Sequence, residues 1–177
     1  MKLPVEPRAK PRRSTDPERV ILFYVSGQIF AIAAEAVQEI RSTDSLAGAA
    51  IEIENPELPK VRHTLERGHH TYYVVNACLH FRLPLERPSL VLILRQQPVA
   101  VLVDRIDRMA EILATYALPE AFAGEERHWY RNLTYLDDTV IPVIDPAGFL
   151  SAEELRGLER SQKAGSPTSE LQRVIPS

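Results

Sequence analysis

Short runs of apolar residues, separated by turn-forming residues, predict a chain built mainly from β-strands. The continuous apolar run at residues 19–25 indicates a strand that is buried on both faces. Residues 28–33 follow it after Ser26 and Gly27, a two-residue turn typical of a hairpin. Further strands are predicted at residues 71–77, 89–95, 98–104, 131–136 and 139–144, from their β-branched and aromatic content.

Other segments have less distinct patterns. Residues 37–41 and 106–113 fit either a strand or a helix, residues 58–66 are ambiguous, and residues 42–59 read as loop. Ser151 with Glu154 three positions later is a capping-box signature, so residues 151–158 are predicted to form a C-terminal helix. A helical turn is predicted at residues 79–83.

Proline and charge are concentrated at both ends of the chain. Residues 1–18 are predicted to be a disordered tail because they hold too little apolar surface to offset the entropy of ordering. Residues 161–177 read as a flexible tail, and residues 19–160 form the folded body. The first tail is rich in Lys and Arg, so a basic arm for an acidic partner stays open beside the favoured solvated tail.

The two halves of the body resemble each other when Phe30 is set against Val99. Residues 30–40 then align with residues 99–109, and the same offset aligns residues 72–77 with residues 141–146. This repeat predicts two similar β subdomains of about 70 residues each. Because each is too small to be very stable alone, we expect them to share a core. Val25, Phe30, Val101 and Val143 lie in its apolar strands and are predicted core residues.

Composition excludes several functional classes. The net charge of −3 does not suggest a nucleic-acid partner, and no apolar run is long enough to enter a membrane as a spanning helix. The chain starts without an apolar leader, and its single cysteine, Cys78, excludes an internal disulfide. We therefore expect a cytoplasmic protein in a reducing environment.

No known catalytic motif is present in the sequence. Gly-x-Ser-x-Gly, a glycine-rich phosphate loop and His-Glu-x-x-His are all missing, so we predict no enzyme, no catalytic residue and no cofactor. Trp129 with Tyr130 and Arg131 is either a contact patch or, more often for such a pair, core packing. Neither alternative supplies reactive chemistry.

Histidines cluster in the middle of the chain. His63, His69, His70 and His80 surround Cys78, and Cys78 and His80 would share one face if the strand continued through them. A site drawn from His69, Cys78 and His80 matches no compact metal loop, so no metal ligand is assigned. Sensing of a ligand or metal through His63–His80 remains the alternative function.

The order of elements resembles the CheW-like family of chemotaxis adaptors. Residues 21–25, 28–32 and 37–40 resemble the opening strands of that family, with Val37-Gln38-Glu39-Ile40 as its Val-x-Glu-Ile segment. Residues 98–106 and 133–145 resemble its Gly-Leu-x-Val-Asp-x-Val strand and its closing hairpin. Residues 61–68 depart from the family's Gly-x-x-Asn-x-Arg-Gly stretch, although Arg67-Gly68 matches the last two positions.

This resemblance implies a fold of two SH3-like five-stranded β-barrel subdomains that share a core, with short helical turns and a C-terminal helix. It implies a non-catalytic scaffold that couples methyl-accepting receptors to a CheA-type histidine kinase. The implied partners are the kinase's CheW-like regulatory domain and the cytoplasmic tip of the receptor. The implied partner-binding residues are Val37, Glu39, Ile40, Arg67 and Gly68, and Arg67 and Gly68 are expected to lie at the partner surface near residues 37–40.

Overall fold

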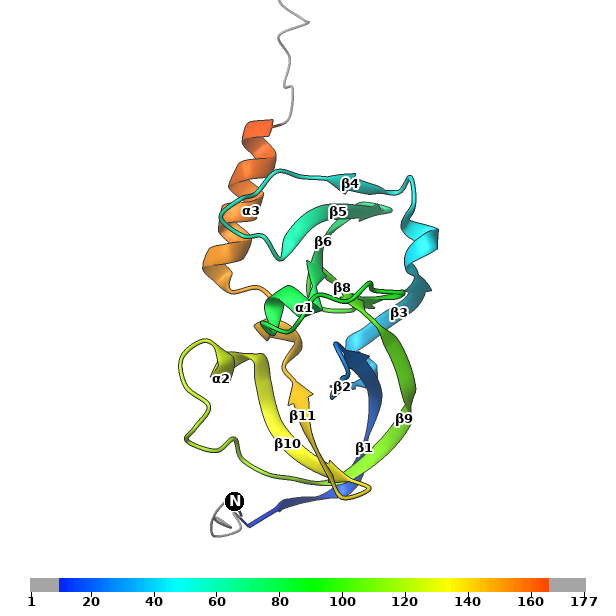
Figure 1. Cartoon of the computed structure of the whole chain (residues 1–177), viewed down its shortest axis with the longest axis vertical. Coiled ribbons are helices and arrows are strands. Elements are labelled where there is room, and N and C mark those ends of the chain that lie inside the picture. Colours follow the sequence, from blue (N-terminus) through cyan, green and yellow to red (C-terminus); the bar gives the residue numbers. More distant parts are fainter. Residues whose placement is uncertain (1–9, 166–177) are drawn as a thin grey trace, which may run out of the picture.

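The computed structural model describes residues 10–165 and confirms the mainly β class, with short helices and one longer C-terminal helix (Figure 1). Eleven strands form two sheets in this part of the chain. The helical elements are η1 (Ala34–Ala36), η2 (Thr43–Leu46), α1 (Ala77–His80), α2 (Glu126–Trp129), η3 (Pro146–Gly148) and α3 (Ala152–Gly165).

The first sheet has the strand order β10-β11-β2-β1-β9. Its strands are β1 (Arg12–Val25), β2 (Gln28–Ala33), β9 (Arg105–Thr115), β10 (Tyr130–Leu136) and β11 (Thr139–Ile144). An isolated antiparallel bridge joins Tyr116, just after β9, to Leu133 of β10. Each N–H donates to the other's carbonyl, at 2.8 and 2.9 Å, so the two ends of the sheet meet and the sheet is strongly curled.

The second sheet has the strand order β3-β7-β8-β6-β5-β4. Its strands are β3 (Val37–Ser42), β4 (Ala50–Glu52), β5 (Val61–Arg67), β6 (His70–Asn76), β7 (Leu90–Leu94) and β8 (Val99–Val103). It has six strands rather than the expected five, because β4 forms within residues 42–59, where the sequence pattern predicts a loop. The extra strand arises because Ala50–Glu52 finds partners on β5, from Leu65 to His63.

The internal repeat is confirmed by the strand register. Thr64 pairs with Tyr73 between β5 and β6, and the equivalent residues of the second repeat, Leu133 and Pro142, pair between β10 and β11. Both hairpins have a register shift after their first pair, and β5 and β10 have the same alternation of buried and exposed side chains. The parallel pair Val74–Ala100 recurs as Val143–Ala31 at the same offset.

The sheets nevertheless do not coincide with the two halves of the sequence. The second sheet is built from the continuous segment 37–103, whereas the first combines β1 and β2 with β9, β10 and β11 (Figure 1). Each repeat therefore places strands in both sheets. The third strand of each repeat pairs with a strand of the other repeat, β3 with β7 and β9 with β1, so the strands of the two repeats are interleaved.

The first strand begins earlier than the sequence pattern predicts. β1 begins at Arg12, inside the predicted tail of residues 1–18, because its backbone pairs with β9 although the side chains of residues 12–17 are exposed. The ambiguous segments 37–41 and 106–113 are both strands. The remainder of the predicted tails, residues 1–9 and 166–177, lies outside the described residues.

The predicted capping box is confirmed at the start of α3. The Ser151 N–H donates to Glu154 Oε2 at 2.8 Å, and the Glu154 N–H donates to Ser151 Oγ at 3.1 Å. These bonds satisfy backbone donors that would lack a partner at a helix N-terminus. α3 then runs past the predicted end of the helix at residue 158 to Gly165 and packs through buried Leu158.

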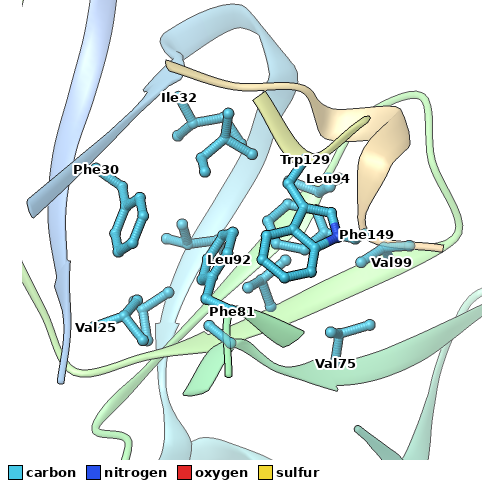
Figure 2. Close-up of a cluster of buried hydrophobic side chains, with 14 of the residues drawn as sticks. Val25, Phe30, Ile32, Val75, Phe81, Leu92, Leu94, Val99, Trp129 and Phe149 are labelled. Atoms are coloured by element: carbon cyan, nitrogen blue, oxygen red, sulfur yellow. The ribbon is translucent and has the colours of Figure 1, made fainter. Parts of the chain in front are cut away.

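The main core lies between the sheets and draws side chains from both (Figure 2). Val25, Phe30, Val101 and Val143 are each at most 2% exposed, which confirms the predicted core positions. The Phe30 ring stacks on that of Phe81, with 4.5 Å between the centroids. Because Phe30 lies on β2 and Phe81 follows α1, this contact joins the two sheets through the core.

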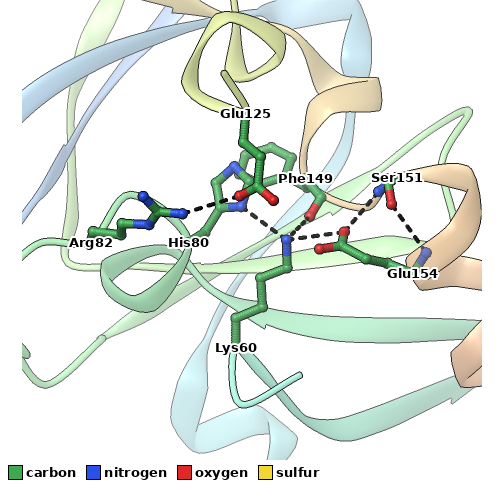
Figure 3. Close-up of polar contacts among 7 residues, drawn as sticks. All are labelled: Lys60, His80, Arg82, Glu125, Phe149, Ser151 and Glu154. Carbon is green, nitrogen blue, oxygen red and sulfur yellow. Dashed lines mark hydrogen bonds and ion pairs between the residues drawn. The ribbon is translucent and has the colours of Figure 1, made fainter. Parts of the chain in front are cut away.

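Lys60 forms a polar junction beside this core (Figure 3). Its ammonium donates to the Phe149 carbonyl at 2.8 Å and to Glu154 Oε2 at 3.2 Å, and it lies 3.3 Å from His80 Nδ1. Its side chain is only 13% exposed, so these partners compensate for the loss of hydration. The junction holds the start of α3 against β5 and α1.

Candidate partner-binding surface

Three of the predicted partner-binding residues lie on β3, at one end of the second sheet's strand order. β3 pairs with β7 on one side only within this sheet. Val37 is buried, Glu39 is half-buried, and Ile40 is 42% exposed. Glu39 and Ile40 point to opposite faces of β3, and the register shift between Val37 and Glu39 puts Val37 on the same face as Ile40. β3 thus presents an apolar side chain beside an edge of the sheet.

Arg67 is brought to β3 by the curvature of the sheet. Arg67 Nη1 lies 2.6 Å from Glu39 Oε2, and Arg41 Nε lies 3.4 Å from Glu39 Oε1. β5 and β3 are separated by three strands in the sheet order, so the ion pair closes a curled surface rather than joining neighbours. The predicted proximity of Arg67 to the β3 segment is confirmed; the role of these residues in binding stays a prediction.

Glycine is favoured at position 68 by the backbone conformation there, not by a lack of space for a side chain. Gly68 follows β5 at a φ of +61°, a conformation that costs most other residues energy, and a Cβ added there would meet no atom within 4 Å. Gly68 therefore permits the turn from β5 to β6 and leaves open space around it. The open space agrees with the predicted exposed position of Arg67-Gly68.

A second ion pair occupies the corresponding place in the other repeat. Arg108 and Asp137 are the repeat equivalents of Glu39 and Gly68, and Arg108 Nη2 lies 2.6 Å from Asp137 Oδ2. Both pairs connect the third strand of a repeat to its hairpin turn, with the charges reversed. Arg108 and Asp137 were not predicted as a pair, although the repeat offset is the signal that locates them.

The histidines do not gather into one site. His63 is half-buried on β5, and His69 and His70 are exposed at the β5–β6 turn. The strand does not continue through Cys78 and His80, as a shared face would require: the Asn76 side chain accepts from the Leu79 N–H at 3.4 Å and starts α1, close to the predicted helical turn at residues 79–83. Residues 10–165 contain no group of three or more His, Cys, Asp or Glu arranged to hold a metal ion. This arrangement does not support the alternative function in which the His63–His80 segment senses a metal.

His80 and Cys78 are both buried and unreactive in character. Burial, followed by the nearby Lys60 and Arg82, lowers the pKa of His80 to about 3, so the ring is uncharged at neutral pH. Burial is also the main reason why the pKa of the Cys78 thiol is raised. A raised pKa disfavours the reactive thiolate.

No helix within the described part of the chain has the length and apolar character needed to cross a bilayer.

Comparison with known proteins identifies the class to which this fold belongs. The CheW-like domain family matches residues 19–154, and because the match spans more than half of the sequence, the chain belongs to that family. The structure is similar to a solved structure of scaffolding protein TtCheW from Thermoanaerobacter tengcongensis, with a TM-score of 0.61 and 14% sequence identity. That similarity covers 73% of this chain and 90% of the other, and it establishes the fold. Among proteins with curated descriptions, none matches this chain.

Proposed function

We propose that this protein is a non-catalytic cytoplasmic adaptor that couples methyl-accepting chemotaxis-type receptors to a CheA-type histidine kinase. Its partners would be the kinase's CheW-like regulatory domain and the cytoplasmic tip of the receptor. Membership of the CheW-like family supports this proposal, and so does the similar fold of a protein described as a scaffold. The observation that carries it is the β3 surface, where Glu39 pairs with Arg67 from a distant strand and the next residue, Ile40, exposes an apolar side chain.

The chemistry of this surface suits protein recognition. Ile40 offers exposed apolar area, and the Arg67 side chain, which is about one-third exposed, can pair with a carboxylate of a partner. Arginine and buried apolar anchors carry a large share of the binding energy at protein interfaces. The one-sided pairing of β3 places both groups where a partner has access.

Co-purification is the direct test of the adaptor function. The full chain, mixed with a CheA-type histidine kinase and with a soluble receptor-tip fragment, is expected to elute in a complex with each of them. The kinase alone and the fragment alone provide the reference elution volumes. Elution of all three components at their separate positions, with the protein folded, would exclude the proposed function.

Arg67→Ala is expected to weaken binding of the receptor tip by about tenfold, in line with truncation of an interface arginine. The fold should persist, because a partly exposed ion pair contributes only about 0–1 kcal/mol to stability. Titration calorimetry measures the affinity, and circular dichroism reports the fold. Gly68→Asn is the appropriate companion variant, since asparagine tolerates a positive φ better than other side chains.

Arg108→Ala is the matched control, because it breaks the corresponding ion pair of the other repeat, which has the same 2.6 Å separation. It should bind the receptor tip like the wild type. Equal affinity of Arg67→Ala and the wild type would place the interface elsewhere. Equal weakening by both variants would show that the two ion pairs act by supporting the fold.

A further inference from the structure

A hollow of about 710 Å³ lies where the connections between the two sheets meet, outside the candidate partner-binding surface. Its wall combines the segment before β5 with α1, α2, η3 and the start of α3. The size falls within the range of small-molecule pockets. Trp129, the single tryptophan of the chain, forms part of the wall and is 8% exposed.

The charged side chains of this hollow comprise one mutually neutralised pair and three further charged residues. Lys60 and Glu154 neutralise each other at 3.2 Å, and the buried, uncharged His80 ring adds no charge at neutral pH. Arg82, Glu125 and Asp145 remain, which leaves one more negative than positive charge on the wall. An aromatic face combined with surplus carboxylate is the chemistry by which proteins hold organic cations.

Arg82 shows how a cation fits at this place, and Figure 3 draws its ion pair with Glu125. Its guanidinium carbon lies 5.7 Å from the centroid of the Trp129 ring, and its Nη2 lies 3.1 Å from Glu125 Oε2. The two ion-paired side chains are 73% and 79% exposed, so water screens the pair and it holds the guanidinium only weakly. The chain's own guanidinium therefore occupies the aromatic face weakly and can be displaced.

We propose that this hollow binds a small organic cation, an ammonium or guanidinium group carried on an apolar stem. The cationic group replaces Arg82 over Trp129 and pairs with the carboxylates of the wall. The stem packs against Leu58 and Leu79, which supply apolar lining. This binding site is separate from the proposed adaptor function and does not depend on it.

Fluorescence of Trp129 provides the measurement, because no other tryptophan of the chain contributes to the signal. The probe is butylguanidinium chloride, titrated into the full chain at constant ionic strength. Butylurea is the neutral control of nearly the same shape. We expect a saturable change of emission with a Kd on the order of 1 mM, a typical weak affinity of about −4 kcal/mol, and no saturable change with butylurea.

Two substitutions change the affinity in opposite directions. Asp145→Asn removes a charge but keeps the side-chain oxygen that accepts from the Ala147 N–H at 3.0 Å, and it should weaken binding by about three- to tenfold. Arg82→Asn removes the internal competitor and suits the local φ of 56°, so it should tighten binding several-fold. Asp138→Asn, in the exposed β10–β11 turn, is the control that leaves the affinity unchanged.

The proposal fails if butylurea binds as well as butylguanidinium, or if Arg82→Asn leaves the affinity unchanged or lowers it. If Asp145→Asn does not fold, Arg82→Asn still decides the question, because its side chain is exposed. Receptor and kinase binding by the same samples distinguishes this failure from a failure of the adaptor function.

Discussion

Phe30→Ala is expected to lower the free energy of unfolding by about 3–5 kcal/mol, the usual range for truncating a buried phenylalanine. Phe30 is 2% exposed, and its ring stacks on Phe81 at 4.5 Å, Phe23 at 5.9 Å and Tyr130 at 6.3 Å. These three neighbours come from different segments of the chain. They are held by their own contacts and can only partly fill the cavity.

Urea denaturation followed by circular dichroism measures this loss. Leu113→Ala is the matched control, because Leu113 is 61% exposed on β9 and its truncation should change stability by at most about 0.5 kcal/mol. A loss below about 1 kcal/mol for Phe30→Ala, well under the range for a buried phenylalanine, would show that the ring does not connect the two sheets in the folded core.

Acidification from pH 7 to pH 4 is expected to remove roughly 3 kcal/mol of stability through His80 alone. The pKa of His80 is about 3 in the folded state, against 6.5 for an unperturbed histidine. Between these values the unfolded chain binds a proton that the folded chain excludes. The stabilisation is therefore complete above about pH 6.5 and is lost as the pH falls toward 3.

Denaturation curves at several pH values test this expectation. His80→Gln carries no titrating ring, so it should flatten the dependence of stability on pH between 7 and 4, even though it disturbs the aromatic contacts around His80. His69→Gln is the control for loss of a histidine, because His69 is exposed and outside the core. An identical slope for His80→Gln and the wild type would show that His80 titrates normally in the folded protein.

The sequence predicted local features of the fold well, because they depend on short-range patterns. The Ser26-Gly27 hairpin joins Val25 to Gln28 as expected, and the Ser151–Glu154 capping box starts α3. The division of strands between sheets was not predictable in this way. It depends on parallel pairings such as Val143–Ala31, between residues near opposite ends of the chain, which no local periodicity encodes.

For the candidate surfaces too, one feature was predicted from the sequence and another was not. Arg67 and Glu39 were placed together from the family resemblance, and the structure pairs them at 2.6 Å. The hollow beside Trp129 was not predicted, because separate segments of the chain build it and no single motif marks it. Trp129 itself had two interpretations, core packing or contact patch; it is buried and also lines the hollow.

The insertion of the second sheet within the first determines the order in which the protein can be completed on the ribosome. β1 and β2 emerge early and β2 ends at Ala33, but β9, one of the strands that completes their sheet, begins only at Arg105. At about 5–20 residues per second, synthesis of the intervening segment takes roughly 4–14 seconds. During that time the run from Val20 to Phe23 lacks its final neighbours in the first sheet. By the end of it, residues 37–103 contain every strand of the second sheet. The nascent chain therefore needs protection for its first hairpin until the last strands arrive.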